Sequence, residues 1–137
     1  MSTNDDEAQH EIWRRICLEQ PRAFEDFPFG PEAAVFKVGA TPERSKMFAF
    51  LSWHRGELIL NLKCEPPIAD RLRTQYPQIT PGYHMNKKHW NTVRVGLPEQ
   101  FMRELIEDSY DLVVAGLSRR DQEFIKIQGI VQDSSLD

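Results

Sequence analysis

The sequence predicts an α+β domain of two layers, an antiparallel sheet with its helices on one face. Apolar residues recur at helical spacing near the N-terminus, after Pro66 and after Pro98, whereas segments between them alternate apolar and polar side chains. Glycine and proline separate these segments, as is typical of turns between antiparallel strands. The expected order is α-β-β-β-α-β-β-α, and the half-polar strands indicate that the far face of the sheet is at least partly open to solvent.

The first helix is expected over residues 5–19. Asn4 suits the N-cap position, and Glu7 three residues later completes a capping box. Pro21 cannot continue a helix and marks its end. The apolar side chains that share one helical stripe, and so face the core, are Ala8, Ile12, Trp13, Ile16 and Cys17.

An aromatic and proline-rich connection follows over residues 24–31. Its X-Pro bonds disfavour helix, and Phe24, Phe27 and Phe29 stand close together in it. Two interpretations are open. Either this loop lies on the hydrophobic core, or its aromatic rings bind another protein.

Strands come next, and three are expected, over residues 34–38, 46–53 and 58–63. The last two are joined by a turn in which Gly56 readily adopts a positive φ. The third strand alternates cleanly, and the side chains expected to face the core are Leu58, Leu60 and Leu62.

The second half of the chain predicts a short helix over residues 66–76 and a turn at Pro81. A strand is expected over residues 89–95, and a long helix starts near Pro98 and ends before Gly116, a natural residue for a helix C-terminus.

Length and composition indicate one domain over residues 1–117, followed by a partly helical extension over residues 118–137 whose end frays. No apolar run is long enough to span a membrane, and the acidic start lacks the features of a secretory signal. Cys17 and Cys64 are expected to be buried and reduced, which agrees with a cytoplasmic protein. The sequence leaves the oligomeric state open.

A second hairpin is the most informative feature of the sequence. If residues 85–88 form its loop, His84 and His89 become cross-strand neighbours, and the tip presents both histidines together with Lys87 and Lys88. Such a tip can place cations against phosphates. The alternative is a solvated hairpin whose lysines only protect a sheet edge.

Cations also fall in the first hairpin turn, at His54 and Arg55, and on the outward face of the predicted sheet. Basic side chains around Trp90 on that face would form a platform for stacked bases and phosphates. Alternatively, Trp90 packs in the core beneath the last helix. The residues expected on the outward face are Lys37, Asn61, Lys63, Trp90, Thr92 and Arg94.

The sequence contains no recognised catalytic or metal-binding pattern. No glycine-rich phosphate loop and no G-x-S-x-G elbow occur. His84 and His89 are the only closely spaced histidines, and a zinc site needs three or four ligands at recognisable spacing. We therefore expect a non-enzymatic protein without catalytic residues, metal or other cofactor.

Two motifs of this sequence are specific: Asn61-Leu62-Lys63-Cys64 and Tyr83-His84-Met85-Asn86-Lys87-Lys88-His89-Trp90-Asn91-Thr92-Val93. Together with others that cover roughly residues 10–117 in the same order, they resemble the MmcQ/YjbR family. The resemblance implies a small α+β fold related to secretion-chaperone-like domains and a DNA-binding role through a double wing of hairpins, and it assigns no catalytic residues.

Charge is distributed unevenly along the chain. Residues 33–97 carry ten basic and four acidic side chains, a net charge of +6, whereas the two ends together carry seven basic and seventeen acidic ones, a net charge of −10. A partner senses such local fields more than the total charge of −4. This asymmetry has two open explanations: an electrostatic signal for a negatively charged partner, or helices that collect acidic residues and leave the rest to strands. Together with the two basic hairpins and the family resemblance, it suggests duplex DNA as a partner, and because no recognition helix is evident we expect little sequence preference.

The predicted DNA contacts are Arg55, Lys63, His84, Lys87, Lys88, His89 and Arg94. The alternative hypothesis is a protein-interaction or chaperone-like domain that binds its partner through a sheet edge and the aromatic loop. The predicted contacts in that case are Phe24, Phe27 and Phe29.

Overall fold

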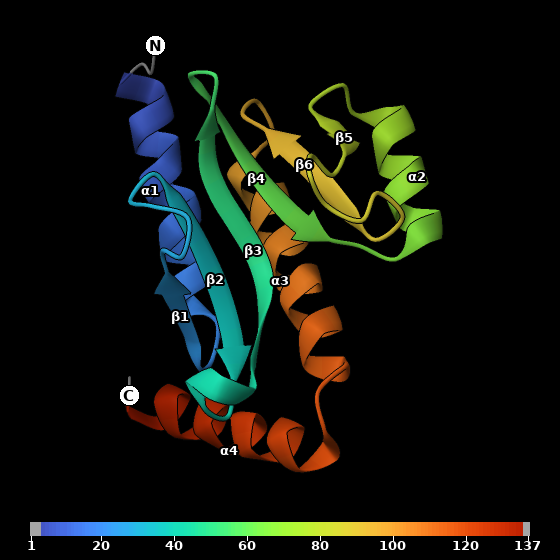
Figure 1. Ribbon diagram of the computed structural model, residues 1–137. Coiled ribbons are helices and arrows are strands. Elements are labelled where there is room, and N and C mark those ends of the chain that lie inside the picture. The colour runs from blue at the N-terminus through green and yellow to red at the C-terminus, as the bar shows by residue number, and fades with distance from the viewer. Residues whose placement is uncertain (1–3, 136–137) are drawn as a thin grey trace.

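Six antiparallel strands form one open sheet, and helices cover one of its faces (Figure 1). The computed structural model describes residues 4–135. The strands lie in the order β1-β2-β3-β4-β6-β5, which confirms the predicted two-layer α+β class. Their bounds are β1 Ala23–Asp26, β2 Ala33–Gly39, β3 Ser45–His54, β4 Glu57–Lys63, β5 Ile79–Pro81 and β6 Trp90–Arg94.

Helices α1 and α3 lie behind the sheet and enclose the core with it, whereas α2 lies beside β5 and β6 and α4 crosses the end of the sheet (Figure 1). Within residues 4–135, no helix combines the length and the apolar composition that crossing a membrane requires. The helices are α1 Asn4–Glu19, α2 Pro66–Gln75, α3 Glu99–Ala115 and α4 Arg119–Ser135, with a 3-10 turn η1 at Pro42–Arg44.

The core lies between α1, α3 and the helix-facing side of the sheet. Leu58, Leu60 and Leu62 are at most 3% exposed there, which confirms the alternation predicted for β4. Trp13 of α1 and Ile106 of α3 pack against the same core. Because burying one leucine side chain contributes about 1.5–3 kcal/mol, this alternation decides which face of β4 turns toward the helices.

Two side chains of α3 fix this helix to the sheet. Ser109 Oγ donates to the carbonyl of Phe48 at 2.6 Å and accepts from the amide of Lys63 at 2.8 Å, so it joins α3 to β3 and β4. The hydroxyl of Tyr110 donates to the carbonyl of Pro21 at 2.7 Å. Both side chains are buried, so breaking these bonds would leave polar groups without water to replace the lost partner.

Strand β1 forms at one edge of the sheet, where the sequence predicts a loop over residues 24–31. Ion pairs hold it from both sides of the sheet: Arg14 Nε of α1 donates to Glu25 at 2.9 Å, and Lys37 Nζ of β2 donates to Asp26 at 3.1 Å. The sequence prediction failed here because so short a strand shows too little periodicity and depends on partners distant in the chain.

Helix α4 occupies the extension predicted over residues 118–137. Its start is tied to η1 by an ion pair between Arg44 Nη2 and Asp121 Oδ1 at 2.5 Å, and Ile125 is buried. Of the segment expected to fray, residues 136–137 lie outside the described residues. The apolar side chains that α4 leaves exposed are Phe124, Ile127, Ile130 and Val131.

Candidate functional site

The hairpin between β5 and β6 is longer than predicted. The strands pair from Ile79 with Val93 to Pro81 with Asn91, so the loop spans residues 82–89 rather than 85–88. His84 and His89 therefore lie within the loop and are not cross-strand partners, which corrects the sequence prediction. Gly82 lies against Trp90: a Cβ atom there would stand only 2.9 Å from the Cβ and carbonyl oxygen of Trp90, and the Gly82 amide donates to that carbonyl at 2.8 Å.

This loop folds back over the sheet instead of projecting as a wing. His84 adopts a positive φ of 56°. The amide of Tyr83 donates to Thr92 Oγ1 at 2.8 Å, and Lys87 Nζ donates to the carbonyl of Gly82 at 2.9 Å. The Lys87 ammonium is thus partly engaged by its own loop.

Arg73 of α2 holds the loop from the other side, and sequence reasoning missed it. Its guanidinium donates to Asn91 Oδ1 at 2.7 Å, to the carbonyl of Trp90 at 3.2 Å and to the carbonyl of Lys87. A single arginine in an amphipathic helix carries no sequence signal for such a role. These bonds make residues 82–89 a structured part of the molecule.

The two hairpins meet through aromatic rings. The ring of Tyr83 lies 4.3 Å from that of His54, at the end of β3, and 4.1 Å from that of His84. Arg55 follows in the β3–β4 turn, with a φ of 52°, and is exposed. This contact brings the turn that carries Arg55 next to the loop that carries Lys87 and Lys88.

The other two cations expected to bind phosphate do not lie in these hairpin loops. Arg94 Nε forms an ion pair with Glu57 at 2.6 Å and also donates to Thr80, so its charge is already neutralised. Lys63 ends β4 and lines a pocket on the helix side of the sheet. Among residues 4–135, the predicted contacts without a carboxylate within ion-pair distance are Arg55, Lys63, His84, Lys87, Lys88 and His89.

The outward face of the sheet is only half open. Over β4 and β6, Asn61 is 3% exposed and Thr92 is fully buried, and Thr92 Oγ1 donates to Asn61 Oδ1 beneath the folded loop. Lys37 is paired with Asp26. Trp90 is half-buried outside the core cluster. Of the cations expected around it, Lys37 and Arg94 are paired with carboxylates, which leaves Lys63, its cross-strand neighbour, without a carboxylate within ion-pair distance among residues 4–135.

Over β2 and β3 the same face carries an uncovered groove of about 550 Å³. Phe29 is 70% exposed, and its ring stacks on that of Phe50 with centroids 5.7 Å apart and planes 10° from parallel. Phe27 is 45% exposed, whereas Phe24 is half-buried in β1. We call this surface the β2–β3 groove; its lining residues are Pro28, Phe29, Val35, Lys37, Met47, Phe50, His84 and Met85.

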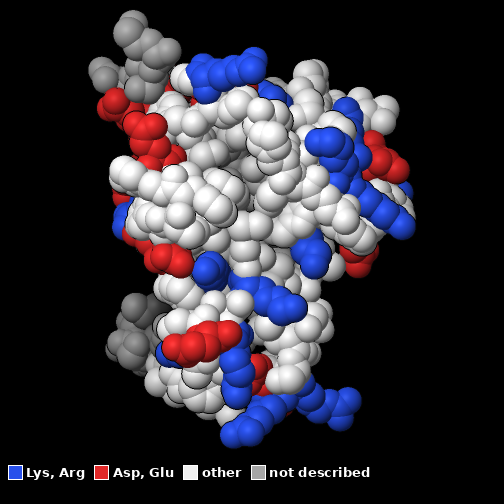
Figure 2. Space-filling view, viewed as in Figure 1, with Lys and Arg blue, Asp and Glu red and all other residues white. Residues whose placement is uncertain are grey.

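Figure 2 shows this face of the molecule in the view of Figure 1. Its centre is free of charged side chains, whereas Lys and Arg lie at its upper edge, along its right side and across its lower part; Asp and Glu line the left edge and also occur among the basic residues on the right and below. The β2–β3 groove is therefore an apolar surface whose charged margin is acidic on the left and more basic on the right and below. Sequence reasoning identified Phe29 but missed Phe50, Met47 and Met85, which reach the groove from other segments.

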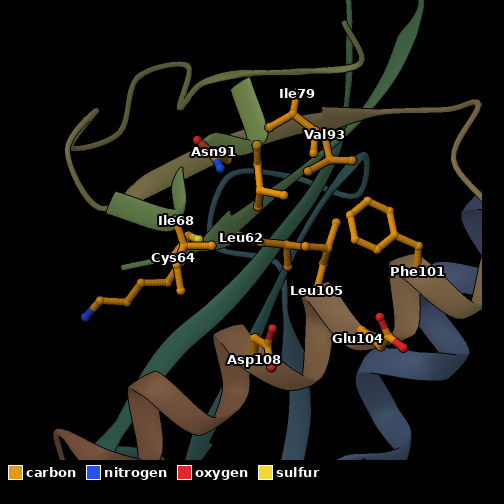
Figure 3. Close-up of a pocket in the computed structure, with 12 residues that line it drawn as sticks. Leu62, Cys64, Ile68, Ile79, Asn91, Val93, Phe101, Glu104, Leu105 and Asp108 are labelled. Carbon is orange, nitrogen blue, oxygen red and sulfur yellow. The ribbon is translucent and has the colours of Figure 1, made fainter. Parts of the chain in front are cut away.

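A second cavity, of about 200 Å³, opens between α2 and α3 (Figure 3). Leu105 and Phe101 point into it from α3 toward Leu62 and Val93 of the sheet, and Asp108 lies at its mouth. We call it the α2–α3 pocket. Its full lining is Leu62, Lys63, Cys64, Ile68, Leu72, Ile79, Asn91, Val93, Phe101, Glu104, Leu105 and Asp108.

The thiols offer little nucleophilic character. Burial, followed by the negative charges of Asp108 and Glu65, raises the pKa of Cys64. Burial also raises the pKa of Cys17 well above its ordinary range. A thiol needs a lowered pKa to react as a thiolate at neutral pH. Among residues 4–135, no group of three or more His, Cys, Asp or Glu side chains is arranged to hold a metal ion.

Comparison with known proteins supports the resemblance to the MmcQ/YjbR family. A family model described as YjbR matches residues 18–112. The uncharacterized protein YbdF of Escherichia coli O157:H7 is 44% identical over 124 residues, which cover 89% of this chain and 98% of that protein. The uncharacterized protein YjbR of Escherichia coli K12 is 29% identical over 102 residues, 73% of this chain and 82% of that protein. A crystal structure of the Deinococcus radiodurans protein DR2400 matches with a TM-score of 0.75 at 39% identity, over 82% of this chain and 84% of that one. This chain therefore belongs to the YjbR family.

Proposed function

We propose that this protein is a non-enzymatic binding domain that takes an apolar, acidic segment of a partner protein in the β2–β3 groove. The observation that supports this most is the stacked pair of Phe29 and Phe50, whose outer ring is 70% exposed beside a large apolar groove. Exposed aromatic side chains of this kind are enriched among the residues that dominate protein interfaces.

The shape and the apolar lining of the groove suit large apolar side chains of a bound partner. Val35, Met47 and Phe50 form its floor on the sheet, and Phe29 and Met85 reach it from the two flanking loops. Methionine side chains adapt to the shape of a bound apolar group. One or two large apolar side chains of the partner would fill this space.

The charged surroundings support an acidic partner. Lys37 and His84 are the polar side chains that line the groove, and Lys and Arg predominate on the right side and in the lower part of this face (Figure 2). Such a margin speeds association with a negatively charged partner and disfavours a basic one. Because Lys37 already pairs with Asp26 at 3.1 Å, its contribution is smaller than that of the unpaired cations.

DNA is the second candidate, and the contact between the two hairpins favours it. The rings of His54, Tyr83 and His84 bring the turn of Arg55 beside the loop of Lys87 and Lys88. Three unpaired cations would give a slope of log K against log salt of about −2.7 on a duplex, a weak and sequence-independent affinity. That weakness places DNA behind a protein partner.

Peptide selection tests the principal proposal. A library of random peptides is selected on the purified wild-type protein, and peptides that bind the support without protein are removed. We expect acidic sequences with one or two aromatic or leucine residues, and at least about tenfold weaker binding of these peptides by Phe29→Ala. Phe124→Ala, which removes an exposed ring from α4, serves as the matched control and leaves the affinity unchanged.

Two results decide against this proposal. Either no sequence class is enriched, or the selected peptides bind wild type and Phe29→Ala equally. A labelled duplex titrated at 50 mM salt decides the second candidate: a double variant, Lys87→Glu with Lys88→Glu, abolishes its binding if the hairpins hold phosphates. No binding by wild type at this salt concentration rejects the DNA candidate.

A further inference from the structure

The α2–α3 pocket reaches from the surface into the hydrophobic core. Its deep wall is formed by Leu62, Ile79 and Val93, each at most 3% exposed, and Leu105 and Phe101 close it from α3 (Figure 3). It lies on the helix side of the sheet, away from the β2–β3 groove. A volume of about 200 Å³ exceeds the roughly 150 Å³ of a known apolar cavity that binds benzene.

The mouth of this pocket is acidic. Glu104 and Asp108 stand one turn apart on α3, and Asp111 follows at the edge of an adjoining recess of about 310 Å³ that shares Cys64, Ile68 and Asp108 with the pocket. Among residues 4–135, none of these three carboxylates has a Lys or Arg within ion-pair distance. Burial, and then the charges of Asp111 and Glu104, raises the pKa of Asp108.

The other charged residues around the pocket leave the balance negative. Lys63 is the only cation among the residues that line the pocket or its recess, and Glu65 adds a fourth carboxylate at the recess. Arg73 of the neighbouring α2 is engaged with Asp70 and with the β5–β6 loop. A bound cation would therefore find carboxylates that no side chain of the described residues already neutralises.

We propose that the α2–α3 pocket binds a small organic cation, a primary ammonium carried on an apolar body about the size of a benzene ring with a short aliphatic arm. The apolar body replaces solvent against Leu105, Phe101 and Val93. The ammonium lies at the mouth beside Asp108 and Glu104. An anion of the same shape would meet these two carboxylates and be repelled.

Phenethylamine is the probe, and 3-phenylpropanoate is its counterpart of opposite charge and similar shape. Methyl NMR spectra of the full chain report where each compound binds, and calorimetry gives its dissociation constant. We expect phenethylamine to shift the methyl signals of Leu105 and Ile68, and 3-phenylpropanoate to bind at least about tenfold more weakly. Phe29→Ala leaves phenethylamine binding unchanged, because that ring lies on the other face of the sheet.

Two variants on α3 distinguish binding inside the pocket from a general attraction of the cation to this acidic helix. Asp108→Asn weakens phenethylamine binding by about fivefold, as expected for one partly exposed ion pair. Glu107→Gln makes the same charge change on an exposed residue of the same helix that does not line the pocket, and it leaves the affinity unchanged. Equal affinity for the amine and the acid, shifts confined to other methyl groups, or equal effects of the two variants would overturn the proposal.

Discussion

Replacing Arg73 by methionine tests how the β5–β6 loop is held. The Arg73 side chain is 18% exposed, and its guanidinium donates to Asn91 and to the carbonyls of Trp90 and Lys87. A hydrogen bond from a charged group contributes about 1.5–3 kcal/mol, and water replaces part of what is lost at a partly exposed site. We therefore expect Arg73→Met to lower the free energy of unfolding by about 2–4 kcal/mol.

This loss in the free energy of unfolding corresponds to a decrease in Tm. At about 2.1 cal/mol/K per residue, a chain of 137 residues has an unfolding entropy near 0.29 kcal/mol/K, so each kcal/mol lowers Tm by about 3.5 °C. The expected decrease for Arg73→Met is thus roughly 7–14 °C, measured by calorimetry. Arg73→Lys keeps the charge but lacks the planar fork, and it recovers less than half of the loss.

Hydrogen exchange localises the effect. The amides of Met85, His89 and Trp90 are hydrogen-bonded within the loop, and we expect them to exchange faster in Arg73→Met than in the wild type. Arg71→Met is the matched control, because Arg71 is exposed on the same helix. Equal Tm values for the two variants, with unchanged exchange in the loop, would refute the role assigned to Arg73.

Two further predictions concern α3. Ser109→Ala leaves the carbonyl of Phe48 and the amide of Lys63 without their buried partner, so we expect a loss of about 2–3 kcal/mol in urea unfolding; a loss below about 0.5 kcal/mol contradicts this. Burial, with the charge of Asp111, raises the folded-state pKa of Asp108 above its ordinary 3.8, so the ionised carboxyl costs stability at neutral pH and this cost vanishes once pH falls below 3.8. Asp108→Asn is therefore expected to raise the free energy of unfolding in urea at pH 7 by less than about 1 kcal/mol, and to have little effect at pH 3.5.

The sequence predicts the layers of this fold well, because they depend on local periodicity. The leucines of β4 alternate as expected and all face the core, and the predicted helix over residues 5–19 differs from α1 by one residue. The family resemblance also holds, since its motifs lie within the region that the family model matches.

The sequence predictions that proved wrong concern features that depend on contacts between segments distant in the chain. The β5–β6 loop spans residues 82–89 rather than the predicted 85–88, and bonds from Arg73 of α2 and to Thr92 of β6 hold it. The charge of Arg94 is neutralised by Glu57, a residue far from it in the sequence. No pattern in a single segment reports such a pair, so counting cations along the chain overestimated how many are available to a phosphate backbone.

The β2–β3 groove was predicted only in part for the same reason. Phe29 belongs to a conspicuous aromatic segment, but Phe50 looks like an ordinary strand residue until the sheet places it under that ring. Met85 reaches the groove only because its loop folds back over the sheet. Sequence reasoning could therefore suggest an aromatic binding loop but not the surface that completes it.

Backbone NMR can show whether the β2–β3 groove is where the partner binds. A selected acidic peptide is titrated into the isotope-labelled full chain, and the amide shifts are mapped onto the structure. We predict that the largest changes fall at Phe29, Phe50 and Met85 and are lost in Phe29→Ala. Changes concentrated instead at α4, or at the α2–α3 pocket, would contradict the account.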